Sequence, residues 1–276
     1  MATVIGIHGT GKYEYFQREG TAEAASAALG RVWSRWLGEG MAAAGRPGPP
    51  VTTGYYAHHL HRGTMQGPDD PGMLDAEAQE LLISWVDLLR TRPQTPMGPR
   101  TARARGAADW VARKHGDAAR RLVTTLSREM TAYLREPAGR RRIAAREAVA
   151  GAVRAAPGPV TVLAHSLGSV VAYEALWAHP ELRVGHLVTL GSPLGMPGAV
   201  FERLVPAPRA GRGARPPGVT RWTNLADVGD LVAIPRTGLS GGFDGVDADH
   251  PDLVIGERDF HTARGYLSCP DVARLL

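Results

Sequence analysis

The chain has 276 residues, 43% of them apolar and 21% charged, with a formal net charge of +5. These values are typical of a globular protein with a sizeable core. The positive charge is mostly arginine mixed with acids, without the aromatic residues that accompany basic stripes in nucleic-acid-binding proteins, so we expect no nucleic-acid partner. One dense cluster is typical of a solvated helix face; it comprises Arg140, Arg141, Arg142 and Arg146.

Cysteine content and the N-terminal residues restrict the class of protein further. The single cysteine, Cys269, excludes an intrachain disulfide and a cysteine-based zinc site. The chain leads directly into an apolar run, without the basic n-region, apolar h-region and cleavage site of a signal peptide. No stretch approaches the roughly 18 apolar residues that a membrane span needs. We therefore expect a cytoplasmic protein with no stable membrane insertion; its oligomeric state is left open.

Short apolar runs rich in β-branched residues alternate along the chain with segments of helical periodicity. The runs predict about six strands, at 3–7, 51–56, 160–163, 186–190, 219–223 and 253–255. The helical patterns include 29–37, 138–155 and 166–178. Strands that alternate with helices predict an α/β fold with a mostly parallel sheet and helices on both faces. We expect one such domain over residues 1–276.

The stretch 58–137 interrupts this alternation. Two loops rich in Pro and Gly, at 67–72 and 92–99, flank an apolar helix at 81–89, and a further helix is expected to include both Trp110 and Tyr133. We interpret the stretch as a helical insertion, cap or lid. The apolar face of 81–89 could contact an acyl chain or a lipid surface, although core packing is the commoner role of such a face.

The strongest chemical signal lies where the apolar strand at 160–163 runs into a helix. Ser166 stands at that corner, with Ala164 two residues before it and Gly168 two residues after it. A sharp strand–turn–helix that exposes a nucleophile requires small residues there, and the segment fits G-x-S-x-G with alanine first. Plain helix capping by Ser166 is the alternative. With a nucleophile at the corner, the amide of Leu167 is one expected oxyanion-hole donor at the positive helix end.

A second oxyanion donor is expected from the glycine-rich loop after the first strand. There the backbone amides of Gly9 and Thr10 can approach a substrate oxygen closely. The segment from Gly6 to Lys12 also fits G-x-x-x-x-G-K, the phosphate-binding loop of NTPases. The next residue is Tyr13, where that loop has the Ser or Thr that binds Mg²⁺. A P-loop-like nucleotide-binding protein is therefore the weaker alternative.

A nucleophilic serine needs a base, and the base needs an orienting acid that lies between them in the chain order Ser, acid, His. The histidines downstream of Ser166 are His179, His186, His250 and His261. His179 ends the helix that starts at the corner, and His186 opens a strand at its far end. His250 and His261 remain, both expected in late loops. His261, just before the last helix, is the predicted base, and His250 is the alternative.

The triad acid should lie beyond the carboxyl end of a later strand. Asp227 and Asp230 both follow the strand that we expect to extend to about residue 224. Each could instead be a turn residue, since aspartate next to glycine favours turns. The residues alone leave the choice between them open.

Together these residues resemble the α/β-hydrolase superfamily, and within it the lipase- and esterase-like members. The matching pieces are 8–11, 164–168, 190–195, 224–235, and His261 with Tyr266. The segment that begins at Asp230 is similar to the Asn-x-Asp-x-Val-Pro segment of many lipases, whose Asp is the triad acid. The resemblance therefore favours Asp230 over Asp227. Two departures are Ala164 in place of the usual glycine and the absence of the two leading strands of larger members, as in compact lipases.

The resemblance implies an α/β-hydrolase fold and a serine hydrolase that cleaves an ester or thioester through an acyl-enzyme. The implied substrate is a small-molecule or lipid-like acyl compound, and the implied chemistry uses no cofactor and no metal. An acyl transferase, a cyclase or a peptidase could use the same triad, because the fold alone does not separate these activities. A non-catalytic binding module is disfavoured because it would not need Ser, Asp and His together.

Overall fold

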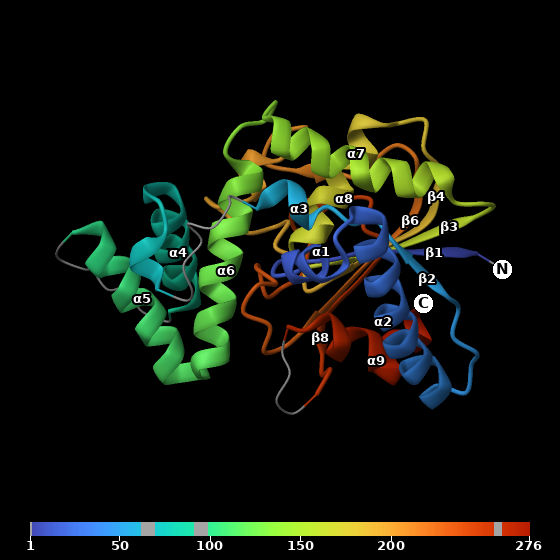
Figure 1. Ribbon diagram of the computed structural model, residues 1–276, viewed down its shortest axis with the longest axis horizontal. Coiled ribbons are helices and arrows are strands. Elements are labelled where there is room, and N and C mark those ends of the chain that lie inside the picture. The colour runs from blue at the N-terminus through green and yellow to red at the C-terminus, as the bar shows by residue number, and fades with distance from the viewer. Residues whose placement is uncertain (1, 62–69, 91–98, 257–260) are drawn as a thin grey trace.

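A computed structural model describes residues 2–61, 70–90, 99–256 and 261–276 (Figure 1). Within these residues, six strands form one open sheet in the order β2-β1-β3-β4-β6-β8, and every neighbouring pair is parallel. The strands are β1 (Thr3–Ile7), β2 (Val51–Thr53), β3 (Val160–His165), β4 (Val184–Leu190), β6 (Val219–Asp227) and β8 (Ala248–Leu253). The prediction of an α/β fold with a mostly parallel six-stranded sheet is confirmed. A separate two-stranded sheet pairs β5 (Gly213–Ala214) with β7 (Phe243–Asp244).

Helices cover both faces of the sheet (Figure 1). One face packs against α7 (Arg140–Ala155) and α8 (Leu167–Ala178). On the other face lie α2 (Ala22–Ala43), α9 (Ala263–Ser268) and α10 (Pro270–Leu275). Alternate strand residues feed the two cores, because side chains alternate across a strand: Ile5 packs on the α8 side and Val4 on the α2 side.

The insertion is helical, as expected, and its helices pack on one another at one end of the molecule (Figure 1). It contains α3 (Ala57–Leu60), a 3₁₀ turn η1 (Pro71–Met73), α4 (Ala76–Leu89), α5 (Arg100–His115) and α6 (Asp117–Leu134). The single helix expected to span Trp110 and Tyr133 is wrong. The chain forms two helices there, because Gly116 takes a left-handed φ of 86° and reverses the chain between α5 and α6.

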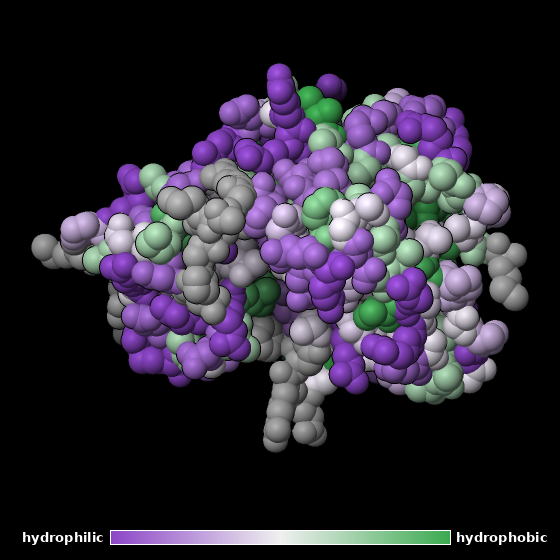
Figure 2. Space-filling view, viewed as in Figure 1, coloured by the Kyte–Doolittle hydropathy of each residue, from purple (hydrophilic) through white to green (hydrophobic). Residues whose placement is uncertain are grey.

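The apolar face of α4 is core packing. Leu82, Trp85 and Val86 are fully buried, while Leu88 is 43% exposed. Apart from Leu88 and the half-buried Leu89, the apolar side chains of the 81–89 face are thus already covered by the protein. The face of the molecule in Figure 2 is correspondingly hydrophilic for the most part, with apolar atoms in small separate spots. No helix in the described residues is both long enough and apolar enough to cross a membrane.

Two sequence expectations about polar segments need correction. The last strand was expected at 253–255, but β8 covers Ala248–Leu253. It is an edge strand carrying polar residues, so it shows no apolar run. The solvated arginine face is wrong for Arg142, which is 1% exposed. Its guanidinium is paired with the buried carboxylate of Glu174 in α8, with 2.8 Å between Nε and Oε2.

The remaining short elements are α1 (Tyr13–Glu19) and a 3₁₀ turn η2 (Phe201–Arg203). The helix α1 follows the loop at the carboxyl end of β1 and packs on α2. In a parallel sheet the carboxyl ends of the strands share one edge, and the loops that follow them lie together. The loops after β1, β3, β4 and β6 meet at this edge.

Candidate active site

The turn between β3 and α8 is made by one residue. β3 ends at His165, α8 begins at Leu167, and Ser166 between them has φ 56° and ψ −131°. Among the described non-glycine residues only Ser166 and Ala210 have a positive φ. Such a backbone conformation costs on the order of 1–3 kcal/mol and persists only where its surroundings impose it. The amide of Ser166 donates to the carbonyl oxygen of Leu190 at 3.0 Å, which holds the turn against β4.

Small residues around this turn permit a close approach of the neighbouring backbone. A Cβ added at Gly168 would collide with the carbonyl oxygens of Ile7 and His8, so α8 could not pack on the end of β1. A Cβ at Gly9 would lie 2.7 Å from the Cβ of Ser166. The glycine-rich loop therefore lies directly against the serine.

Ser166, His261 and Asp230 form one chain of hydrogen bonds. The Ser166 Oγ lies 2.9 Å from the Nε2 of His261, and the His261 Nδ1 lies 2.8 Å from each carboxylate oxygen of Asp230. The three residues are 1%, 4% and 1% exposed, respectively. They come from the turn after β3, the segment before α9 and the loop after β6. With an Nδ1–H tautomer, His261 donates to Asp230 and accepts from the serine hydroxyl.

The surroundings of Asp230 favour its ionised form. Its Oδ1 accepts hydrogen bonds from the amides of Val232 at 2.8 Å and Ala233 at 3.2 Å. Its Oδ2 accepts one from the Tyr266 hydroxyl at 2.7 Å. Burial by itself would raise the pKa of Asp230, but the charge of His261 and these hydrogen bonds outweigh burial and lower the pKa. Asp230 is thus an acceptor for the imidazole.

The alternative acid and base lie apart from this chain. Both carboxylate oxygens of Asp227 accept backbone amides, from Gly229 at 2.7 Å and from Ile255 at 2.9 Å. This matches the turn role that was its other interpretation. His250 lies in β8 opposite Leu225, not in a loop as expected. The described hydrogen bonds link neither residue to Ser166 or His261.

The loop after β1 is held at both ends by tyrosines from the segment after β2. At its start, the Tyr56 hydroxyl donates to the carbonyl oxygen of His8 at 2.7 Å. The His8 ring donates from Nδ1 to the carbonyl oxygen of Gly9 and accepts the Tyr56 amide at Nε2. Burial lowers the pKa of His8 to about 3, so the ring is neutral. At the other end, the Tyr55 hydroxyl donates to the carbonyl oxygen of Lys12 at 2.7 Å.

Two of the three predicted oxyanion residues, Gly9 and Leu167, adjoin the serine. In the described structure, the amides of Thr10 and Leu167 donate to no protein acceptor. Gly9 touches Ser166, and Leu167 is the first residue of α8, where free amides are expected. By contrast, Gly6 of the phosphate-loop pattern lies within β1, and a Cβ there would lie 2.5 Å from the Trp33 ring. Gly6 therefore serves the packing of α2 on the sheet.

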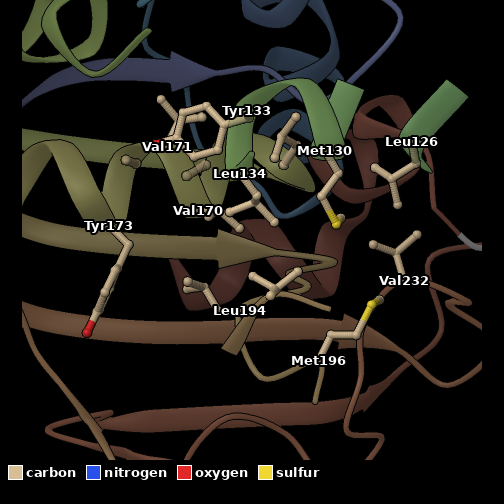
Figure 3. Close-up of a cluster of buried hydrophobic side chains, with 14 of the residues drawn as sticks. Leu126, Met130, Tyr133, Leu134, Val170, Val171, Tyr173, Leu194, Met196 and Val232 are labelled. Atoms are coloured by element: carbon tan, nitrogen blue, oxygen red, sulfur yellow. The ribbon is translucent and has the colours of Figure 1, made fainter. Parts of the chain in front are cut away.

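The insertion contacts two of these loops. The Glu129 carboxylate of α6 accepts the amide of Gly11 at 2.9 Å, and the Trp85 indole of α4 donates to the carbonyl oxygen of Leu231 at 2.8 Å. Fully buried apolar side chains fill the space between α6 and the loops after β4 and β6 (Figure 3). They include Leu126, Met130, Leu194, Met196 and Val232. Ser166 itself is 1% exposed and is thus closed off from solvent.

The sequence did not reveal that His165 and Gly191 pack against His261 and Asp230. The Nε2 of His165 lies 2.6 Å from the carbonyl oxygen of His261, and burial lowers the pKa of His165 to about 3, so this ring is a neutral donor. Gly191 takes φ 55°, and a Cβ there would lie 2.5 Å from the Oδ2 of Asp230. Gly191 lies in the segment 190–195, which is one of the pieces that resemble the family. No local signal in the sequence indicates what His165 contacts.

The described residues offer no candidate metal site. In the part of the chain that the structure describes, no group of three or more His, Cys, Asp or Glu residues could hold a metal ion. A surface cavity of about 480 Å³ is lined by Tyr173, Trp177 and the segment 205–214, and none of the three hydrogen-bonded residues lines it. The chain matches no family model, no curated protein and no solved structure.

Proposed function

We propose that this protein is a serine hydrolase of the α/β-hydrolase type that cleaves a carboxylic ester or thioester. Ser166 is the nucleophile, His261 the general base and Asp230 the orienting acid. The observation that carries the proposal is the hydrogen-bond chain from Ser166 through His261 to Asp230, built on a serine with a strained backbone. A serine that merely capped α8 would need neither a buried histidine nor a buried acid behind it.

The arrangement of the chain supports the same proposal. The order Ser166, Asp230, His261 is that of α/β-hydrolases, in which the nucleophile stands on a sharp strand-to-helix turn above a parallel sheet. The six-stranded open sheet is compatible with that family. The packing of Gly6 against α2 leaves the nucleotide-binding alternative without a supporting observation.

The reaction follows from the geometry in two steps. In the first, the Oγ of Ser166 attacks the carbonyl carbon while His261 takes its proton, and Asp230 stabilises the resulting imidazolium. Amides of Leu167 and of the Gly9–Thr10 segment stabilise the oxyanion. The imidazolium then protonates the leaving oxygen or sulfur, which departs and leaves the acyl group on Ser166. In the second step His261 takes a proton from the water that attacks the acyl-enzyme, and it returns that proton to the Oγ of Ser166 as the acid is released.

We infer that the substrate carries an apolar acyl group. The side chains between α6 and the loops after β4 and β6 are aliphatic or thioether groups, as Figure 3 shows. Because these side chains are close-packed, an acyl chain can enter only where they move apart. The substrate class that fits these apolar side chains is a small-molecule acyl ester or thioester. A lipid-like substrate would carry a longer acyl chain.

The test is intact-mass spectrometry after exposure to a fluorophosphonate probe. Wild type should gain one adduct, and Ser166→Ala should gain none. The matched control is Ser127→Ala, which removes a buried hydroxyl of α6 that has no hydrogen-bond partner and should leave the adduct unchanged. An adduct that persists in Ser166→Ala, or its absence from well-folded wild type, would overturn the proposal. Turnover of acyl esters with and without added amine or alcohol acceptors then separates hydrolysis from acyl transfer.

A further inference from the structure

The hydroxyl of Tyr266, in α9, contacts the Oδ2 of Asp230, which also lies 2.8 Å from the Nδ1 of His261. It donates to the Asp230 Oδ2 at 2.7 Å and accepts the backbone amide of Asp227 at 2.8 Å. Because the Asp227 amide occupies its acceptor position, the hydroxyl proton is directed to Asp230. Tyr266 is fully buried, and burial raises its pKa well above the ordinary value, so the phenol stays protonated and remains a donor.

The two oxygens of the Asp230 carboxylate are held by different groups. Two backbone amides hold Oδ1, from Val232 and Ala233, whereas the Tyr266 hydroxyl is the one donor to Oδ2 besides His261 in the described structure. The side chains of His261 and Tyr266 both lie beside Oδ2, and a Cβ added at Gly191 would come within 3.1 Å of each of them. The orientation of the carboxylate plane toward His261 therefore depends on the phenol.

From this geometry we propose that Tyr266 is a positioning residue of the active site, which orients the Asp230 carboxylate toward His261 and withdraws negative charge from it. This inference rests on the proposed function for its catalytic consequence, but not for the hydrogen bond itself. A tyrosine that only filled the core between α9 and the sheet would act on stability alone.

Removal of the hydroxyl has a defined direction of effect. In Tyr266→Phe the carboxylate loses one donor and becomes more basic, so the imidazolium beside it holds its proton more tightly. The acid limb of the pH profile of kcat/KM should move to higher pH by roughly half a unit, because the loss of one hydrogen bond changes a proton affinity by about that much. Loss of orientation should lower kcat about 10- to 100-fold with little change in KM. The other titratable groups facing the pair are His165, Asp227 and Lys12, and the substitution leaves them in place.

The experiment compares wild type, Tyr266→Phe and 3,5-difluorotyrosine at position 266. The fluorinated phenol nearly keeps the size of tyrosine and is a stronger donor, so it should move the acid limb in the opposite direction. Tyr173→Phe is the matched control, since it removes a buried hydroxyl that donates to the carbonyl oxygen of Ala214, far from the triad. That control should leave the pH profile unchanged.

A second readout does not require turnover. The proton between the His261 Nδ1 and Asp230 gives a downfield NMR signal, whose shift should change in opposite directions in the two variants. Identical signals and identical pH profiles in all proteins would overturn the inference. If the signal responds as expected but wild type neither reacts with the fluorophosphonate nor turns over esters, the proposed function fails while the hydrogen bond from Tyr266 stands.

Discussion

Gly191 and Asp230 lie so close that a methyl group at Gly191 would come within 2.5 Å of the Oδ2 of Asp230. The same methyl group would lie 3.1 Å from the Nδ1 of His261. The loop after β4 therefore packs directly against Asp230 and His261 and leaves no room for a side chain at Gly191.

Gly191→Ala should therefore displace the Asp230 carboxylate and lower kcat/KM by about 100-fold or more, since a misplacement of about 1 Å has that effect. The control is Gly198→Ala, because Gly198 also has a positive φ, 69°, but a Cβ there meets nothing within 4 Å. Steady-state kinetics on both variants separate the steric effect from backbone strain. Equal losses in the two variants would contradict the expected collision.

Asp230→Asn and Asp227→Asn should differ strongly in their effect on kcat. Replacement of Asp230 leaves the wrong hydrogen-bonding partner for His261 and should lower kcat roughly 10⁴-fold, as for other triads. Asp227→Asn should change kcat little, because its oxygens accept the amides of Gly229 and Ile255 and do not reach the histidine. A similar contrast is expected between His261→Ala and His250→Ala. A larger loss of kcat in Asp227→Asn than in Asp230→Asn would make Asp227 the acid, and a larger loss in His250→Ala than in His261→Ala would make His250 the base.

Glu129 should make stability depend on pH. Burial raises its pKa from 4.5 to about 7 in the folded protein. Between these values the unfolded chain has already lost the proton that the folded chain retains, so the free energy of unfolding falls as pH rises through this window. Glu129→Gln keeps an oxygen for the Gly11 amide and removes the titration. Urea unfolding at pH 4, 6 and 8 should show the variant gaining relative to wild type as pH rises; a constant difference would contradict this.

The buried pair of Arg142 and Glu174 should be costly to break. Glu174 also accepts the Tyr133 hydroxyl at 2.7 Å and the Val205 amide at 3.0 Å, so it joins α6, α7 and α8 to the loop after η2. Glu174→Gln or Arg142→Met should each lower the free energy of unfolding by about 3–5 kcal/mol, because each leaves one buried charge unpaired. Exposed Arg140→Met should change it by less than about 0.5 kcal/mol. A double-mutant cycle measured in urea checks the coupling.

Local patterns were sufficient for the features that depend on nearby residues. The serine turn needs a strand, a helix and two small residues within a few positions, and the structure has this turn at Ser166. Position in the chain favoured His261, and the family resemblance favoured Asp230; the structure brings both into one hydrogen-bond chain with Ser166, although their chemical roles stay a prediction. The sheet was predictable because buried parallel strands are nearly continuous apolar runs.

Features that depend on distant partners were not predictable. Arg142 resembles its exposed neighbours in sequence, and partners distant in the chain explain its burial: Glu174, 32 residues away, and the carbonyl oxygen of Arg203. Asp227 and Asp230 lie beyond the same strand, and the difference between them is made by His261 and Tyr266, which come from the end of the chain. β8 is a polar edge strand, so periodicity gives no sign of it.

The hydrogen bonds from Glu129 to Gly11 and from Trp85 to Leu231 have a consequence for engineering. If the proposed function holds, exchange of the helical insertion is a route to altered substrate preference. The same helices, however, bond to the loop that contains Gly9 and Thr10 and to the loop that contains Asp230. A transplanted insertion would have to reproduce both hydrogen bonds. Without them, the graft would displace the two loops as well as change the shape of the pocket.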